Sequence, residues 1–291
     1  MALPPLLPWA VRASWAVLPF TAGPALGAAL DPRSVPVRLL CSATLWLGWA
    51  AVLCATLVPY PVGLTMLRMA APAAVAATAA AGVAGHPSPL AVASAVLAAL
   101  VALAPETATL FVNGAAYPNE RRYPLKPPGP LLLGPLQLAW ALALGTPAAG
   151  ALLLATGKWV AGGLTMAAAA PVAVVLARSI HGLSRRWVVF VPAGLVLHDP
   201  VALADPVLFR RQQVEALEPA PAGAEALDLT QGALGLALQL VLREEAQLTL
   251  TRPGSRVGRT ETASRLLFTP TRPGAVLAEA RARRLKVPGG A

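Results

Sequence analysis

The chain has 291 residues, of which 56% are hydrophobic and only 12% are charged, and its formal net charge is +10. Soluble globular domains carry about 25% charged residues, so this composition excludes an ordinary soluble protein. The basic residues are spread along the chain rather than concentrated in one patch, which argues against nucleic acid as a partner. We therefore expect the lipid bilayer to be the main surroundings of much of the chain.

The charged residues divide the chain into two regions. Residues 1–186 contain 11 Lys and Arg but only 3 Asp and Glu, whereas residues 187–291 contain 12 and 10. Most of the acids thus follow residue 186, where long apolar runs also stop. The pattern predicts a transmembrane domain over 1–186, followed by a water-soluble domain over 187–291.

Six apolar segments are long enough to cross a hydrocarbon core of about 30 Å as helices. Pro19 and Pro24 are expected to kink the first segment. The fourth has an uncertain end, because its purely apolar run stops at Ala104 while the helix can continue past Glu106; we favour an end near Asn113. The predicted spans cover about 8–30, 38–58, 62–84, 89–113, 131–156 and 159–177. Small residues are abundant in all six, which favours a closely packed helical bundle.

The basic loops predict the orientation. Six spans place both termini on the side of the polar loop 117–128, and the positive-inside rule makes that side the cytoplasm of a bacterial plasma membrane. Four tryptophans near span ends are expected to anchor at the membrane interface, namely Trp9, Trp15, Trp159 and Trp187. Six bases on this side are candidates for contact with anionic lipid headgroups, namely Arg121, Arg122, Lys126, Arg178, Arg185 and Arg186.

Two charges fall inside the predicted spans. Arg68 lies about seven residues into the third span and Glu106 about seven residues before the end of the fourth, so antiparallel packing puts both about 10 Å from the cytoplasmic surface. We predict that they form an ion pair, which either fixes helix packing or marks a proton or substrate site. Side chains that reach separately to the interface are a further alternative.

The hydrophobic period changes to two after Arg186, which indicates strands. Leucines alternate over 234–242 and again over 247–251, and the polar segment 243–246 between them predicts the turn of a hairpin. A second hairpin is predicted from 187–191 and 195–198. Further strands are predicted at 207–211, 214–217, 227–230 and 264–268. A helix is predicted to follow, with Thr271 as its N-cap and with Val276, Leu277 and Ala280 on one face.

Two stretches, 186–200 and 267–280, resemble the bacterial pleckstrin-homology-like domain, a small bent sheet or barrel closed by a C-terminal helix. The whole chain also resembles uncharacterised bacterial multispanning membrane proteins that carry such a cytoplasmic domain. The fold class expected is thus an all-α membrane bundle of about six transmembrane helices followed by a small β-rich domain. Phosphoinositide binding is not carried over, because the first hairpin turn, 191–194, has no Lys or Arg.

The sequence contains no catalytic or metal-binding motif. His86, His181 and His198 are dispersed, so we expect no catalytic residue, no metal and no cofactor, and the chain is not predicted to be an enzyme. Our preferred hypothesis is a membrane-anchored binding, regulatory or scaffold module whose cytoplasmic domain contacts a protein partner or the inner leaflet. The alternative is a small transporter or lipid-handling protein with a polar site near Arg68 and Glu106.

Overall fold

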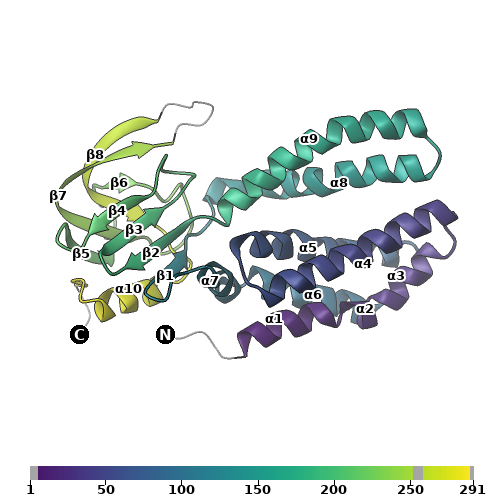
Figure 1. Cartoon of the computed structure of the whole chain (residues 1–291), viewed down its shortest axis with the longest axis horizontal. Coiled ribbons are helices and arrows are strands. Elements are labelled where there is room, and N and C mark those ends of the chain that lie inside the picture. Colours follow the sequence, from purple (N-terminus) through teal and green to yellow (C-terminus); the bar gives the residue numbers. More distant parts are fainter. Residues whose placement is uncertain (1–5, 252–257, 289–291) are drawn as a thin grey trace. The chain divides into compact units, whose positions relative to one another are not determined.

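The computed structural model describes residues 6–251 and 258–288. The chain forms two compact units, each described here by itself (Figure 1). The helical unit runs to Gly114 and resumes over Gln137–His181, while the β-rich unit combines Ala115–Leu136 with the chain from Gly182 onward. The predicted loop at 117–128 therefore belongs to the β-rich unit. The sequence is not divided between the two units at a single boundary near residue 186.

The helical unit contains five helices or helix series long and apolar enough to cross a membrane. The first is interrupted at Val17 and Ala22, each two residues before one of the prolines expected to kink it, Pro19 and Pro24. It comprises α1 (Leu7–Ala16), α2 (Leu18–Thr21) and α3 (Gly23–Leu30). The others are α4 (Val35–Leu57), α5 (Pro61–Val83), α8 (Pro135–Ala155) and α9 (Trp159–Leu183), the last extending past the predicted end at 177.

The predicted fourth span is not one straight helix. It is split into α6 (Pro89–Leu103) and α7 (Pro105–Asn113), which meet at an angle of 58°. The helical residues do end at Asn113, but Pro105 interrupts them because it has no N–H and its ring clashes with the preceding turn. The pair is either a broken sixth span or a re-entrant loop.

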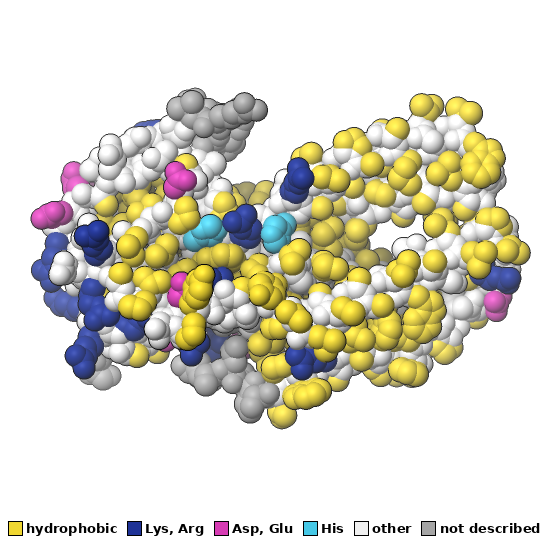
Figure 2. Space-filling model, in the orientation of Figure 1, with side chains coloured by type: hydrophobic (Ala, Val, Ile, Leu, Met, Phe, Trp, Pro, Cys, Tyr) yellow, Lys and Arg dark blue, Asp and Glu magenta, His cyan; other side chains and the backbone are white. Residues whose placement is uncertain are grey.

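The helical unit buries many small residues and exposes many large apolar ones, although Trp15, Leu64 and Phe111 are buried as well. Small residues such as Ala71, Ala95 and Ala102 are fully buried between helices, whereas Phe20 and Val83 are more than four-fifths exposed. Figure 2 accordingly shows hydrophobic side chains over the visible face of the helices, with charged ones gathered mostly over the β-rich unit. Soluble proteins bury their large apolar residues, so this arrangement is typical of helices surrounded by lipid.

The first sheet of the β-rich unit has the strand order β1-β2-β3-β4, with antiparallel neighbours. The predicted hairpin forms β2 (Trp187–Val191) and β3 (Gly194–His198), and the predicted strand at 207–211 forms β4 (Val207–Arg210). The edge strand β1 (Arg121–Pro124) comes from the predicted loop. A short 3-10 helix, η1 (Gly129–Leu133), then leads toward α8. Gly194 has a φ of 158°, and a Cβ there would clash with the carbonyl oxygen of Phe209, so the start of β3 requires glycine.

The second sheet has the order β5-β7-β8-β6 and corrects the predicted hairpin. The segment 243–246 is not a turn: it lies within the long strand β7 (Leu238–Leu250), where a bulge between Val241 and Ala246 interrupts pairing with β8. A bulge lets charged residues leave the ladder without ending the strand. Leu234 and Leu236 precede β7 and are exposed. The other strands are β5 (Val214–Pro219), β6 (Leu227–Asp228) and β8 (Arg259–Phe268).

The helix α10 (Pro273–Ala282) completes the β-rich unit. Val276, Leu277 and Ala280 are buried on one face, as predicted, and belong to the same core as Phe190, whereas the predicted cap is wrong. The N-cap position is Arg272, and the hydroxyl of Thr271 is buried without a hydrogen-bond partner in the described chain. Pro273 lies in the first turn of α10, where proline is favoured, and the helix begins there without a side-chain cap.

Candidate functional site

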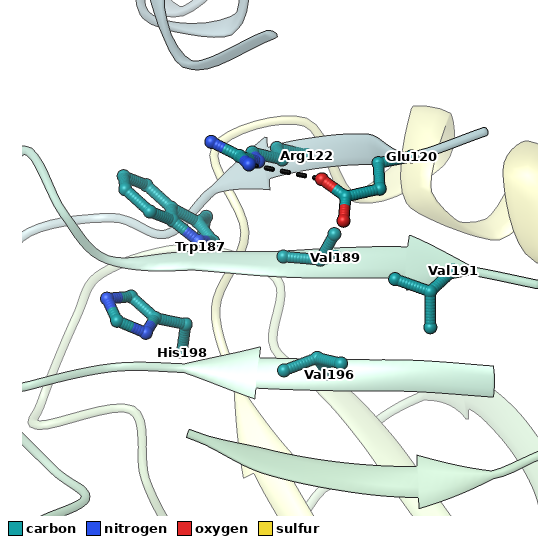
Figure 3. Close-up of a pocket in the computed structure, with 7 residues that line it drawn as sticks. All are labelled: Glu120, Arg122, Trp187, Val189, Val191, Val196 and His198. Carbon is teal, nitrogen blue, oxygen red and sulfur yellow. Dashed lines mark hydrogen bonds and ion pairs between the residues drawn. The ribbon is translucent and has the colours of Figure 1, made fainter. Parts of the chain in front are cut away.

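The best-defined surface site of the β-rich unit lies on the face of the β1–β2–β3 sheet that points away from its core. Along β2, Val188 and Phe190 enter the core, so the alternation of a strand turns Trp187, Val189 and Val191 to the other face. Cross-strand neighbours share that face, since Val189 pairs with both Arg122 and Val196. The pocket has a volume of about 250 Å³ and is lined by Glu120, Arg122, Trp187, Val189, Val191, Val196 and His198 (Figure 3).

One end of this pocket is a stack of three side chains. The rings of Trp187 and His198 are parallel within 16° with centroids 5.0 Å apart, and the guanidinium of Arg122 lies 5.5 Å from the Trp187 ring. Arg122 also forms a 3.1 Å ion pair with Glu120, drawn dashed in Figure 3. Its charge is thus balanced locally, and the rest of the pocket is made of valine side chains.

His198 is held neutral in this position. Burial lowers its pKa below the ordinary value, and the positive charges of Arg185 and Arg122 act in the same direction, while Asp199 opposes them. Its Nε2 is enclosed and has no hydrogen-bond partner within the described part of the chain. The site therefore presents a stacked, uncharged ring beside three valines rather than a general base poised near neutral pH.

A buried ion pair fixes the strands that carry the site. Arg186 Nε and Nη2 donate to the two carboxylate oxygens of Asp199, each at 2.7 Å, and Arg186 Nη1 donates to the carbonyl oxygen of Lys126 at 2.7 Å. Both side chains are only 1% exposed. Arg186 therefore ties the segment after β1 to the β2–β3 hairpin, and the prediction that it contacts a lipid headgroup is wrong.

The other predicted headgroup contacts are dispersed. Arg121, Arg178 and Arg185 are exposed, and lipid contact stays a prediction for them. Lys126 Nζ donates to the carbonyl oxygen of Leu234 at 2.8 Å. Arg122 lies in the pocket described above, so the six bases form no single patch.

The predicted intramembrane residues lie next to the α6–α7 break. Because Pro105 lacks an N–H and the helix turns there, the carbonyls of Val101 and Ala102 lose their partners in the next turn. Arg68 Nε donates to the Ala102 carbonyl oxygen at 3.4 Å, and Thr107 Oγ1 donates to that of Val101 at 2.6 Å. Both side chains thus donate hydrogen bonds to backbone carbonyls that would be costly to leave unsatisfied in a hydrocarbon environment.

Glu106 lies in the first turn of α7, directly after this break. Acidic groups are favourable at a helix N-terminus, which gives Glu106 a structural reason for its place. Its ion pair with Arg68 stays a prediction. Thr65 likewise has a structural role, because its hydroxyl contacts the Pro61 carbonyl oxygen at 3.2 Å and His181 Nδ1 at 2.8 Å, which joins α5 to the end of α9.

Two predicted membrane anchors occupy other places. Trp187 is part of β2, and Trp15 is buried in the helical unit, where Trp15 Nε1 donates to the Trp49 carbonyl oxygen at 3.0 Å and Trp49 Nε1 to that of Trp15 at 3.1 Å. The sequence pattern did not reveal the pocket, because Glu120 and Arg122 seemed to lie in a loop. The alternation over 187–191 was the one signal that could have indicated its floor.

Among the described residues, no group of three or more His, Cys, Asp or Glu side chains could hold a metal ion. Comparison of the chain with protein-family models, with curated proteins and with solved structures gave no match. The function must therefore be argued from the two units themselves.

Proposed function

We propose that this protein is a multi-pass protein of a bacterial plasma membrane whose helices anchor a cytoplasmic, pleckstrin-homology-like binding domain. The membrane assignment is supported by the five long apolar helices and by the small residues buried between them. The domain assignment is supported by two four-stranded sheets, whose strands are mostly antiparallel, and by the helix α10 that follows them. Strand β1 departs from that pattern, because it lies between α7 and α8 in the sequence, ahead of the other strands of the domain.

The observation that carries the binding role is the pocket on the β1–β2–β3 face. Its lining combines the valines and the stacked Trp187 and His198 with the charged groups of Arg122 and Glu120, which pair with each other. An anionic headgroup site needs unpaired bases, whereas an apolar pocket with a balanced polar rim fits a side chain of a protein partner. We therefore assign the site to a peptide or protein segment with an apolar anchor residue.

A crosslinking experiment in native membranes tests this assignment. Leu208 pairs with Val196 across β3 and β4, shares the pocket face and is 43% exposed, so a photoreactive residue there should capture the partner. Gln247, exposed on β7, is the matched control position. We expect one protein adduct at position 208 and none at position 247.

A second substitution tests whether formation of the adduct depends on the pocket. Val191→Asp places a charge at the rim and should abolish the adduct at 208, while Glu244→Lys on β7 should leave it unchanged. The assignment fails if the adduct persists in Val191→Asp, or if the photoreactive residue captures only lipid.

A lipid-handling role is a second candidate, and one observation favours it. The helical unit contains an apolar cavity of about 760 Å³, within the range of about 300–1,000 Å³ common to small-molecule sites. A transporter working through Arg68 and Glu106 is less favoured, because Arg68, Thr107 and Thr65 are engaged with backbone carbonyls. A transport assay in vesicles that showed loss of flux in Thr107→Val but normal folding would reverse this preference.

A further inference from the structure

The structure assigns an occupant to the cavity of the helical unit: we propose that it holds an acyl chain of a bilayer phospholipid. The cavity is formed by α1 to α5, by Ala95 of α6 and by Leu144 of α8, and Figure 2 shows a hollow between the α8–α9 hairpin and the other helices. The inference rests on the proposed membrane insertion but not on the proposed partner of the β-rich unit.

The dimensions of the cavity suit a chain that lies along the helices. Its lining on α5 extends from Met66 to Thr78, which corresponds to about 18 Å at 1.5 Å per residue. This is more than half of a hydrocarbon core of about 30 Å. An elongated apolar space of this length matches an extended acyl chain better than a compact solute.

The lining offers water few partners, because most of its polar groups other than the Ser42 hydroxyl bond to backbone carbonyls. The hydroxyls of Thr44 and Thr78 donate to the carbonyl oxygens of Leu40 and Val75 in their own helices, at 2.8 and 2.9 Å. The indole N–H groups of Trp15 and Trp49 are also bonded to carbonyls, so their rings contribute apolar surface. A buried water needs two to four polar partners, and apolar cavities without them stay dry or take apolar guests.

The charges at one end of the cavity fit a phosphate headgroup. Arg38 precedes the lining residue Ser42 by four positions on α4 and so lies on the same helix face one turn away. Arg33 follows the lining residue Leu30 by three positions, and both arginines are exposed. A chain in the cavity would thus place its headgroup near two bases and one acid, Asp31, at the end of α3 and the start of α4, where the net charge is positive.

The chain supplies a matched pair of glycines for the test. Gly48 on α4 lines the cavity and Gly163 on α9 does not, and a Cβ added to either meets no atom within 4 Å. Gly48→Leu therefore adds a side chain in the cavity from a Cβ that has open space, while Gly163→Leu adds the same volume elsewhere. Gly27→Leu on α3, also open and also lining the cavity, is an independent second filling variant.

The measurement is phosphatidylglycerol binding to the delipidated full-length protein in detergent, followed by native mass spectrometry. We expect Gly48→Leu and Gly27→Leu to weaken binding about tenfold, as if about two methylene groups were no longer buried, and Gly163→Leu to bind like the wild type. Arg38→Gln should weaken phosphatidylglycerol more than phosphatidylcholine. Equal binding by the wild type and both filling variants overturns the inference.

Two further outcomes distinguish a bound acyl chain from a bound second copy of the protein and from a helical unit that lies outside the membrane. If Gly48→Leu converts a dimer into a monomer without changing lipid binding, the occupant is a helix of a second copy and the inference is overturned. Extraction of membranes with alkaline carbonate tests insertion independently: protein that is released contradicts the membrane proposal itself. Protein that is retained but shows no cavity-dependent lipid binding contradicts only the acyl-chain inference.

Discussion

The two units of this protein bury different residues, although both are rich in apolar side chains. The β-rich unit buries phenylalanines and leucines, such as Phe190 and Leu217, around one core, as soluble domains do. The helical unit buries many alanines between its helices, together with a few large side chains such as Trp15 and Phe111, and exposes many other large apolar side chains. The exposed apolar side chains of the helical unit are those expected if lipid surrounds its helices, as proposed above.

The units also differ in how they satisfy buried polar groups. The β-rich unit places a full ion pair in its interior, with Arg186 and Asp199 joined by two hydrogen bonds. In the helical unit, Arg68 and Thr107 donate instead to carbonyls freed by a proline. The first arrangement ties distant segments together, whereas the second stabilises the bend between α6 and α7.

The largest expected effect is the loss of the buried ion pair. Arg186→Ala leaves the Asp199 carboxylate buried without its partner, which should lower the free energy of unfolding of the β-rich unit by about 3–5 kcal/mol. Chemical denaturation followed through a fluorophore attached to that unit measures it. Arg185→Ala, at the exposed neighbouring position, should change stability by less than about 0.5 kcal/mol. Similar values for the two variants would show that the ion pair does not hold the unit together.

A smaller effect is expected from a large residue in the helical interior. Ala98 is 2% exposed on α6, so Ala98→Leu should overpack the helix contacts and destabilise the unit by about 1–3 kcal/mol. Ala93, exposed on the same helix, is the control position, and Ala93→Leu should be nearly neutral. Thermal unfolding in detergent gives the comparison. A larger loss of stability at position 93 than at position 98 would contradict the close packing of Ala98 between helices.

The bend between α6 and α7 provides a third prediction. Thr107→Val keeps the shape of the side chain but removes the donor to the Val101 carbonyl oxygen, which should cost about 1–3 kcal/mol because that carbonyl is left with a poorer partner. Thr146→Val on α8 is the control, since its hydroxyl donates within an unbroken helix and is exposed. Equal losses in the two variants would mean that the break needs no side-chain support.

The smallest effect is a pH dependence confined to the β-rich unit. Burial lowers the pKa of His198, so the unfolded chain takes up a proton near pH 6.5 that the folded unit resists. The stability contributed by the neutral ring is therefore present above about pH 6.5 and is lost as the pH falls through the lowered pKa. His198→Phe should flatten the decline in stability between pH 7 and pH 5. An unchanged slope would show that His198 protonates freely in the folded protein.

Sequence patterns predicted the long elements and missed those that depend on distant partners. Helix length and apolar composition were enough for α4, α5, α8 and α9, and the alternation over 187–198 was enough for β2 and β3. Strand β1 looked like a loop because it is short, polar and ends at Pro124, features that suit an edge strand but are shared with loops. The β7 bulge and the burial of Arg186 depend on partners far along the chain, so local patterns could not reveal them.

The helical dimensions favour a broken sixth span over a re-entrant loop. The 15 residues of α6 extend about 22 Å, and the 9 residues of α7, bent by 58°, add about 7 Å along the same axis. The sum, about 30 Å, matches the hydrocarbon core. A broken span puts the start of the chain and the β-rich unit on the same side, whereas a re-entrant loop puts them on opposite sides.

The most direct test of a cytoplasmic binding domain is therefore the sidedness of three single cysteines in a variant that lacks Cys41 and Cys54. Probes at Ser34, Lys158 and Asp205 report the α3–α4 loop, the α8–α9 loop and the β-rich unit. With an impermeant thiol reagent on intact cells, we predict labelling at positions 34 and 158 but not at 205. Labelling at 34 and 205 but not at 158 would make α6–α7 a re-entrant loop and place the β-rich unit outside, which contradicts a cytoplasmic binding domain.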